Sequence, residues 1–500
     1  MHSGRCLIMA KCIMVQGTMS GVGKSLLTAA LCRIFTRDGY KTAPFKSQNM
    51  ALNSYITSDG LEMGRAQAVQ ALAAGKEPDV RMNPILLKPS SDTGSQVIIN
   101  GTVRGNYSAK SYFKMKKSLI PEIMSAYNAL AEENDIIVIE GAGSPAEINL
   151  RADDIVNMGL AGLVNAPVLL VGDIDRGGVF AQLYGTVCLL EEDERRRVAG
   201  TVINKFRGDP DILSPGLVML EEKTAVPCLG VVPYTSVQLD DEDSLAPQLE
   251  QTVARKSIDI AVIRLPHISN FTDFAPLEQH PALGVRYVEA VWELGRPDML
   301  IIPGTKNTMG DLEWLRQSGL ETQIRRLHHS GTPVLGICGG YQMLGLTISD
   351  PRCVEHGGEL AGIGLLPVKT KFEEEKVRSR VSGTVTLPFG SASVEGYEIH
   401  MGRTECGDAS PFCILSDGQT DGAVSGSCFG TYLHGLFDSG ELTARFADWL
   451  LERKGLAPKN IKPETHHDFQ ERQFDMLADV VRRSIDLPAI YRVMEEYTHE

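Results

Sequence analysis

The stretch GTMSGVGKS, residues 17–25, restricts the possible folds more than any other part of the sequence. It follows a short apolar run, and its end opens SLLTAALCRIF, in which apolar residues repeat at helical spacing. A strand, a glycine-rich turn and a helix in this order form a phosphate-binding loop, in which backbone N–H groups face the phosphates. Lys24 would neutralise the phosphates and Ser25 would ligate Mg²⁺. We therefore expect a parallel α/β sheet carrying this loop.

The spacing of this loop is unusual, because five residues rather than four separate Gly17 from Gly23. The longer form resembles the loop of dethiobiotin synthetase and its relatives. An alternative is that the glycines only turn the chain, but this leaves the lysine and serine at the helix start unexplained. The predicted nucleotide-binding residues are Gly17, Thr18, Gly21, Gly23, Lys24, Ser25 and, from a later strand, Asn204.

Short apolar strands alternate with helix-period segments along most of the chain, as is typical of parallel α/β folds. The predicted strands are CIMVQ, DIIVIE, APVLLVGD and GTVINK in the first half, and SIDIAVIRLP, GVRYVEA, DMLIIPG and TPVLGI in the second. The acidic stretch between the two sets predicts a linker. The expected division is a synthetase-type domain at 1–240, a linker at 241–256, a second α/β domain at 257–450, and a helical tail at 451–500 that packs on the second domain.

Composition and charge exclude several classes of protein. The net charge of −14 argues against sequence-independent binding of nucleic acid, which needs a basic face. The ten cysteines contain no C-x-x-C pair or zinc-type cluster, which indicates free thiols in a reducing compartment. We see no signal peptide and no apolar run long enough to span a membrane, so we expect a cytoplasmic protein without a membrane partner. The sequence makes no prediction about oligomeric state.

Two acidic residues are candidate metal ligands in the first half. Glu140 ends the predicted strand DIIVIE, and ligands collect at the carboxyl edge of a parallel sheet. It could instead cap the following turn. Glu62, in LEMGRAQAVQALAA, is a second candidate. Asn204 and Lys205, at the end of GTVINK, could contact the nucleotide base or form a plain turn.

Cys338 ends the apolar run TPVLGI and is followed at once by two glycines. Those glycines would let another molecule approach the thiol, as a nucleophile requires, although buried structural thiols are also common in sheets. A nucleophilic cysteine needs a base, for which His434 in FGTYLHGLFD is the candidate. It also needs an oxyanion hole, which the N–H of Gly339 and one from the turn at Gly304 could form.

These residues resemble the class I glutamine amidotransferases, whose nucleophile lies in a Gly-x-Cys-x-Gly-x-Gln frame, here GICGGYQ. The resemblance implies that Cys338 and His434 hydrolyse glutamine and that Gln342 helps to hold it. The class usually has a glutamate two residues after the histidine, where this chain has Leu436. This leaves open which residue orients His434; Glu398 is one candidate.

The whole chain resembles the branch of the cobyrinic and cobyric acid amidotransferases that forms cobyric acid. The matching stretches span residues 13 to 438 and include GTMSGVGKS, PFKSQNMALNS, EMGRAQAVQALAA, EGAGSPAEINL, DIDRGGVFA, PGTKNT, GICGGYQMLG, GYEIHMGRT and GTYLHGLFD. The resemblance implies use of Mg²⁺, ATP and glutamine to amidate the b, d, e and g carboxylates of adenosylcobyrinic acid a,c-diamide. It also implies corrinoid contacts, for which the candidates are Lys46, Gln48, Asn49, Asn53, Lys88 and Arg176.

Three other functions remain to be considered from the sequence, one of them a free-standing glutaminase subunit that feeds a partner, which the intact nucleotide motifs disfavour. The nearest is the a,c-diamide synthase reaction, which is the same chemistry on a less amidated corrinoid. A P-loop ATPase switch would also explain the phosphate loop, but it would have no use for a glutaminase cysteine. The second domain therefore favours an amidotransferase.

Overall fold

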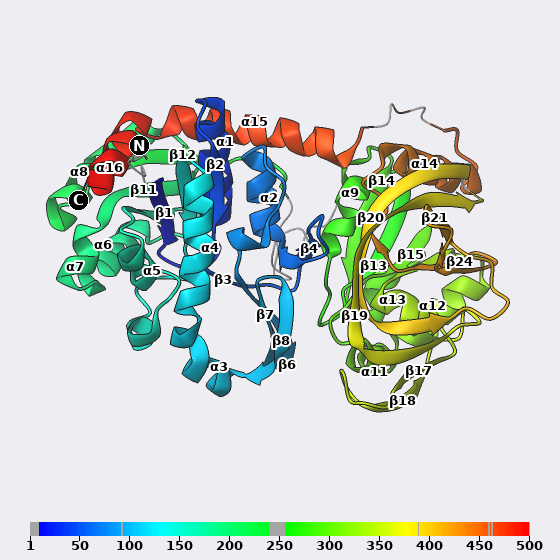
Figure 1. Ribbon diagram of the computed structural model, residues 1–500. Coiled ribbons are helices and arrows are strands. Elements are labelled where there is room, and N and C mark those ends of the chain that lie inside the picture. Colours follow the sequence, from blue (N-terminus) through cyan, green and yellow to red (C-terminus); the bar gives the residue numbers. More distant parts are fainter. Residues whose placement is uncertain are drawn as a thin grey trace, which may run out of the picture. The chain divides into compact units, whose positions relative to one another are not determined.

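The computed structural model describes residues 10–91, 94–239, 256–388, 390–458, 461 and 464–499 (Figure 1). These residues form two compact units. Unit 1 comprises the residues up to Met50, Glu62–Leu239 and those from Gln470 onward; unit 2 comprises Ala51–Leu61 and the later residues up to Phe469. Apart from Lys256, the linker predicted at 241–256 lies outside the described residues.

A parallel sheet of six strands organises unit 1, in the order β12-β11-β10-β1-β9-β2. Every residue of β9 and β10 is buried, as expected for central strands covered on both faces. The four strands predicted in the first half correspond to β1, β9, β10 and β11. The sheet strands are β1 (Lys11–Gly17), β2 (Thr42–Phe45), β9 (Ile136–Glu140), β10 (Val168–Asp173), β11 (Val198–Phe206) and β12 (Cys228–Pro233).

A second, four-stranded sheet of unit 1 was not expected from the sequence. It has the order β3-β6-β7-β8, and its edge strand β8 alternates between exposed and half-buried residues. Its strands are β3 (Gln48–Met50), β6 (Ile85–Ser91), β7 (Gly94–Ile99) and β8 (Thr102–Ser108), and β5 (Glu62–Gly64) precedes α2. The helices are α1 (Lys24–Arg37), α2 (Arg65–Ala73), α3 (Ala109–Met115), α4 (Ile120–Glu133), α5 (Met158–Leu163), α6 (Val179–Leu189), α7 (Glu192–Arg196) and α8 (Pro210–Thr224).

Unit 2 is also built on a six-stranded sheet, with the order β14-β13-β15-β16-β24-β23. Only β23 among these strands runs antiparallel to its neighbour. The four strands predicted in the second half correspond to β13–β16. The sheet strands are β13 (Ile258–Ile263), β14 (Leu283–Val288), β15 (Met299–Ile302), β16 (Val334–Ile337), β23 (Ala423–Ser425) and β24 (Cys428–Thr431).

A long antiparallel hairpin, β19 (Lys369–Leu387) and β20 (Gly390–Glu405), forms the centre of a second, mixed sheet in unit 2 (Figure 1). Its other strands are β17 (Thr347–Asp350), β18 (Gly358–Ala361), β21 (Cys413–Leu415), β22 (Thr420–Asp421) and β25 (Leu433–His434), and β4 (Ser54–Ile56) lies in the early segment of unit 2. The helices are α9 (Ala275–Gln279), α10 (Val291–Leu294), α11 (Thr308–Gln317), α12 (Leu320–His329), α13 (Gly339–Leu344) and α14 (Gly440–Arg453).

The C-terminal tail differs from the expectation that it packs on the second domain. Most of α15 (His466–Ser484) and all of α16 (Leu487–His499) belong to unit 1. Phe474 and Ile490 are buried in the same apolar cluster as Ile13 of β1 and Phe35 of α1. An apolar stripe predicts that a helix packs, but it does not specify which sheet it covers. None of the helices in the described ranges is long and apolar enough to cross a membrane.

Candidate active sites

The phosphate loop of unit 1 joins β1 to α1 in a conformation that requires glycine. Gly21 and Gly23 have φ values of +74° and +96°, in the left-handed region that L side chains rarely adopt. A Cβ at Gly17 would lie 2.5 Å from Cγ2 of Val22. The side-chain amide of Asn204 donates to the Val22 carbonyl at 2.8 Å, so the end of β11 braces the loop.

Lys24 lies across the loop, as a phosphate-binding lysine should. Its Nζ donates to the carbonyl oxygens of Met19, at 3.1 Å, and Gly143, at 3.0 Å. The Thr18 hydroxyl donates to Oε1 of Gln182 at 3.1 Å. The ammonium group is therefore held at the mouth of the loop by carbonyl groups, which a phosphate oxygen would outcompete as a partner because it carries negative charge.

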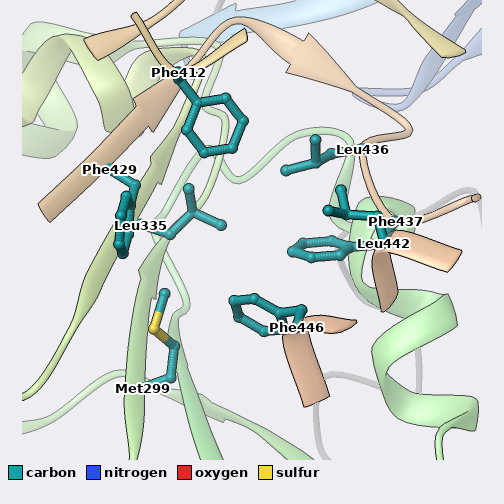
Figure 2. A pocket seen from close by; sticks show the side chains of 8 residues that line it. All are labelled: Met299, Leu335, Phe412, Phe429, Leu436, Phe437, Leu442 and Phe446. Carbon is teal, nitrogen blue, oxygen red and sulfur yellow. The ribbon is translucent and has the colours of Figure 1, made fainter. Parts of the chain in front are cut away.

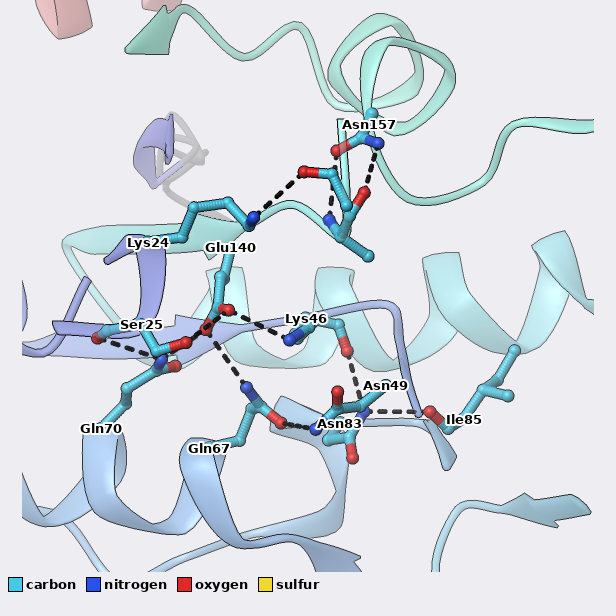
Figure 3. A network of polar contacts seen from close by, with 12 residues as sticks. Lys24, Ser25, Lys46, Asn49, Gln67, Gln70, Asn83, Ile85, Glu140 and Asn157 are labelled. Atoms are coloured by element: carbon cyan, nitrogen blue, oxygen red, sulfur yellow. Dashed lines mark hydrogen bonds and ion pairs between the residues drawn. The ribbon is translucent and has the colours of Figure 1, made fainter. Parts of the chain in front are cut away.

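Glu140, at the end of β9, is the centre of a buried polar network (Figure 3). Its Oε1 accepts hydrogen bonds from the Ser25 hydroxyl at 2.8 Å and from Lys46 Nζ at 3.0 Å. Its Oε2 accepts from the side-chain amides of Gln70, at 2.5 Å, and Gln67, at 3.4 Å. The carboxylate thus joins the phosphate-loop serine to residues from two other elements.

The surroundings keep Glu140 ionised. Burial alone would raise the pKa of this carboxyl, but the charge of Lys46 and the hydrogen bonds from Gln70 and Ser25 outweigh it and lower the pKa. An ionised carboxylate beside a serine hydroxyl is the oxygen donor set that Mg²⁺ prefers, with phosphate oxygens and waters completing its shell. The described residues contain no cluster of three or more His, Cys, Asp and Glu residues suited to a metal.

A second layer of amides positions this network. Asn49 Nδ2 donates to Oε1 of Gln67 at 2.8 Å, which orients Gln67 toward Glu140. Asn83 donates to the backbone carbonyl of Lys46 at 3.1 Å and to that of Ile85 at 3.0 Å, which fixes the turn from which Lys46 projects (Figure 3). The side chains around Glu140 are therefore held in place before any ligand binds.

Cys338 lies at a sharp turn between β16 and α13 in unit 2. Its φ of +52° is rare for a residue with a side chain, and such strain occurs often at functional positions. The thiol is almost fully buried, and its Sγ contacts the Ile399 carbonyl at 3.5 Å. The turn presents the sulfur at the carboxyl edge of the parallel sheet, where substrates of α/β proteins bind.

The two glycines after Cys338 have a different role from the one that their sequence suggested. A Cβ at Gly340 would lie 2.0 Å from the Ile302 carbonyl oxygen, and one at Gly339 would lie 2.7 Å from Thr305 Cγ2. Their missing side chains therefore let α13 pack closely against the end of β15. Ile302 and Thr305 therefore occupy the space beside these glycines that we had expected a substrate to use.

His434 is fully buried on β25 and pairs with Asp273, a residue of the 3₁₀ turn Phe271–Phe274. Its Nδ1 lies 2.6 Å from Asp273 Oδ2, while Asp273 Oδ1 accepts from the Gly435 N–H at 3.0 Å. Burial would lower the pKa of His434, but Asp273 and the neighbouring Cys338 outweigh it and raise the pKa to about 10. A carboxylate only accepts, so Nδ1 carries the proton and Nε2 is left for the thiol.

Leu436 and Glu398 do not orient His434. Leu436 lines an apolar cavity within unit 2 and points into it, so a carboxylate at this position would be buried among hydrocarbon (Figure 2). Glu398 accepts a hydrogen bond from Ser379 at 3.4 Å, and Asp273 occupies the place beside His434 that we considered for it. Glu398 is thus a wrong prediction, because it pairs with Ser379 of β19 and Asp273 contacts His434 instead. The cavity is lined by Met299, Leu335, Phe412, Phe429, Leu436, Phe437, Leu442 and Phe446.

Two family models match the chain. Residues 13–245 match the CobQ/CobB/MinD/ParA nucleotide binding domain, and residues 259–442 match the CobB/CobQ-like glutamine amidotransferase domain. A protein of Ruminiclostridium cellulolyticum named cobyric acid synthase is 57% identical over 98% of this chain and 98% of its own length. The chain belongs to the cobyric acid synthase family. Proteins of the same name from Lachnoclostridium phytofermentans and Alkaliphilus metalliredigens are 55% and 54% identical, over 98% and 96% of this chain and 100% and 99% of their own lengths.

Membership of the cobyric acid synthase family confirms the resemblance drawn from the motifs, and with it the α/β fold and the class of enzyme, a glutamine amidotransferase. The nucleotide-binding model supports use of ATP. Among solved structures, one titled as the crystal structure of a glutamine amidotransferase covers 39% of this chain and 99% of its own, with 16% identity and a TM-score of 0.29. At that score the likeness carries no argument.

In this member of the cobyric acid synthase family, several residues predicted to bind substrate or metal form contacts with other residues of the chain. Glu62 forms a buried ion pair with Lys88 at 2.9 Å, and Gln48 accepts from the Tyr112 hydroxyl at 2.6 Å. Asn53 is fully buried and belongs to unit 2, unlike the other five predicted corrinoid contacts. Their direct contact with substrate therefore stays a prediction.

Gln342 is similarly held. Its Nε2 donates to the Tyr432 hydroxyl at 3.1 Å, and its Oε1 accepts from the Thr308 hydroxyl at 3.1 Å. Gly304 faces the base, since a Cβ there would lie 3.2 Å from Cε1 of His434. The structure thus brings Gln342 and Gly304 into the region of Cys338 and His434, and their contacts with glutamine remain predictions.

Sequence reasoning missed Gln67, Gln70 and Asp273. The two glutamines had a signal, since they lie three residues apart among the alanine, valine and leucine residues that follow Arg65 in the helix RAQAVQALA, and both are buried. Asp273 had none, because its partner His434 is 161 positions away.

Proposed function

We propose that this protein uses ATP and glutamine to amidate the b, d, e and g carboxylates of adenosylcobyrinic acid a,c-diamide, giving adenosylcobyric acid. The observation that carries the proposal is the presence in one chain of a phosphate loop with Ser25 beside Glu140, and of Cys338 with a His434–Asp273 pair. A switch ATPase would need only the first of these. The name of the relatives supplies the corrinoid substrate.

In unit 1 the reaction is activation of a carboxylate, because ammonia cannot displace oxide from a carboxylate. Transfer of the γ-phosphoryl group of ATP gives an acyl phosphate, whose phosphate is a good leaving group. Lys24 and the loop N–H groups stabilise the phosphates, and Ser25 and Glu140 would hold Mg²⁺, which supplies further positive charge there when bound. Lys46, beside Glu140, adds positive charge at the edge where the carboxylate must meet the phosphate.

In unit 2 the reaction is hydrolysis of the glutamine amide. Because the pKa of His434 is raised to about 10, its Nε2 already holds the proton of the Cys338–His434 pair at neutral pH. The sulfur attacks the amide carbon, and His434 gives this proton to the departing ammonia. Asp273 holds Nδ1–H and stabilises the imidazolium. The Gly339 N–H and the Gly304 turn would stabilise the oxyanion. Water then hydrolyses the thioester and releases glutamate.

The two reactions belong together because free ammonia is mostly protonated at neutral pH. Production of ammonia by the same chain that forms the acyl phosphate raises its effective concentration there. We expect this enzyme to act in the cytoplasm, where ATP and reduced thiols are available.

The test is to incubate the purified protein with Mg-ATP, amide-labelled glutamine and the corrinoid a,c-diamide, and to count the labelled nitrogens in the product by mass spectrometry. Four added nitrogens would support cobyric acid formation. No reaction with the a,c-diamide, together with two nitrogens added to cobyrinic acid, would instead identify an a,c-diamide synthase.

A further inference from the structure

Segment 51–61 lies between two parts of unit 1 in the sequence but folds as part of unit 2. The chain leaves unit 1 after Met50, next to the Asn49 that orients Gln67, and returns at Glu62. Within unit 2, Ile56 is fully buried and forms an apolar cluster with Tyr397 and Ile399 of β20. The segment therefore packs on the strand that faces the glutaminase site.

Tyr397 connects this segment to the catalytic base. Tyr397 and His434 are directly opposite each other on β20 and β25, and their rings stack with centroids 5.3 Å apart and planes 23° apart. The Tyr397 hydroxyl donates to the Ser54 carbonyl at 3.4 Å and accepts from Asn270 Nδ2 at 3.0 Å. Asn270 precedes the turn that carries Asp273. The same loop therefore contacts the Nδ1 edge of the His434 ring through Asp273, and through Asn270 it contacts Tyr397, which is stacked on the face of that ring.

Arg380 of β19, directly opposite Tyr397 of β20, also holds the segment. Its Nε donates to the Ile56 carbonyl at 3.3 Å, its Nη2 donates to the Tyr55 hydroxyl, and its guanidinium lies 5.3 Å from the centroid of the Tyr55 ring. The rings of Tyr55 and Tyr397 are 6.3 Å apart. Arg380 thus holds the backbone that presents the Ser54 carbonyl to Tyr397.

We propose that Tyr397 is a positioning residue for glutamine hydrolysis and that segment 51–61 holds it in place. Asp273 sets the proton on Nδ1 of His434 but leaves the ring free to tilt about that hydrogen bond. Tyr397, stacked on the face of the ring, removes this freedom and keeps Nε2 directed at Cys338. The inference rests on the proposed glutaminase reaction. It adds that segment 51–61, which lies in the sequence between two parts of unit 1, is needed for full activity of His434 in unit 2.

The test compares Tyr397→Leu, which removes the stacked ring, with Tyr397→Phe, which keeps the ring and removes its two hydrogen bonds. Glutamine hydrolysis and ammonia-driven amidation are measured for each full-length variant. We expect Tyr397→Leu to lower kcat for glutamine about twofold to tenfold with KM nearly unchanged, and Tyr397→Phe to lower it less. Ammonia-driven amidation should stay at the wild-type rate in both, which also shows that the protein has folded.

Arg380→Ala tests the segment while leaving Tyr397 and His434 themselves unchanged, although Arg380 is directly opposite Tyr397 in the β19–β20 ladder. Arg403→Ala, an exposed arginine on β20, is the matched control. Arg380→Ala should lower kcat no more than Tyr397→Leu does, and Arg403→Ala should leave it unchanged. In the double variant Arg380→Ala/Tyr397→Leu, kcat should equal that of Tyr397→Leu alone, because both changes act on one contact.

Wild-type kcat in both Tyr397→Phe and Arg380→Ala would overturn the proposal, and so would additive losses in the double variant. A rise in KM at constant kcat would also overturn it, since that would place Tyr397 in substrate binding. Failure of the wild-type protein to hydrolyse glutamine would instead contradict the proposed function itself.

Discussion

Each unit has one buried carboxylate at the centre of its site, and the two carboxylates are stabilised in different ways. Glu140 in unit 1 accepts hydrogen bonds from a lysine, a serine and two glutamines. These four donors keep the buried carboxylate ionised. Asp273 in unit 2 accepts from one histidine and one backbone N–H. Glu140 can therefore exchange partners when a cation arrives, whereas Asp273 is committed to His434.

This difference fits what the two reactions require. In the proposed reaction a nucleotide and its metal would enter and leave unit 1, which suits a carboxylate surrounded by replaceable side-chain donors. In the proposed glutaminase reaction His434 would give a proton to the departing ammonia in every cycle, so it would need a fixed partner and a fixed ring. We therefore expect changes in unit 1 to affect ligand binding and amidation, and changes in unit 2 to affect the rate of ammonia release.

The largest expected effect separates the two units. Cys338→Ala should lower glutamine hydrolysis by at least about a thousandfold, because the nucleophile is lost. Amidation driven by added ammonium salt should continue at the wild-type rate. Glutamine hydrolysis is measured by release of glutamate, and amidation by the mass of the corrinoid product. Retained glutamine hydrolysis would contradict the assignment of the nucleophile, and loss of both activities would show that the units are not separable.

Glu140→Gln is the reciprocal change and should lower ammonia-driven amidation by about a hundredfold or more, because the candidate metal ligand loses its charge. Glutamine hydrolysis should be retained. The change also leaves Lys46 buried without its carboxylate partner, so a melting curve of the variant should accompany the assay. Normal amidation at limiting Mg²⁺ would rule out the proposed ligand role.

Asp273→Asn should lower kcat for glutamine by about tenfold to a thousandfold while preserving the shape of the site. The neutral amide can donate as well as accept, so Nδ1 of His434 no longer has to carry the proton. Ammonia-driven amidation serves as the internal control. If Glu398→Gln rather than Asp273→Asn reduced glutamine hydrolysis, the residue that orients His434 would be Glu398 and not Asp273.

The same pair predicts how the stability of unit 2 depends on pH. The pKa of His434 is raised from 6.5 to about 10 in the folded protein, so the stabilisation is fully present below pH 6.5 and is lost as pH rises through about 10. Asp273→Asn should therefore lower the melting temperature strongly near neutral pH and little above pH 10. Equal losses at both pH values would contradict the ion pair.

The smallest effect is expected from Thr308→Val, which removes one hydrogen bond to Gln342. Loss of a bond to a buried amide costs about 1–3 kcal/mol, so the melting temperature should fall. If Gln342 only supports the fold, KM for glutamine should change little. A clear rise in KM would show that Gln342 also contacts the substrate, as the sequence resemblance implies.

The parts of both sites that lie within one short stretch of sequence could be predicted. The phosphate loop and the Cys338 turn each combine a strand, glycines and a helix start, and that order already fixes their local geometry. Asp273 could not be predicted, because its role depends on a partner brought close only by the fold. The same reason explains the tail, whose apolar stripe predicted packing but not its location on unit 1.

The assignment of segment 51–61 to unit 2, and of the C-terminal helices to unit 1, has a consequence for how such a gene can evolve or be engineered. Division of the coding sequence at the boundary between the two family matches would not yield two complete proteins. The first product would carry away the segment that unit 2 needs, and the second would carry away the helices that cover unit 1. Division into two functional genes would therefore require segment 51–61 to move to the second gene and the C-terminal helices to move to the first. This requirement favours inheritance of the two activities as one polypeptide.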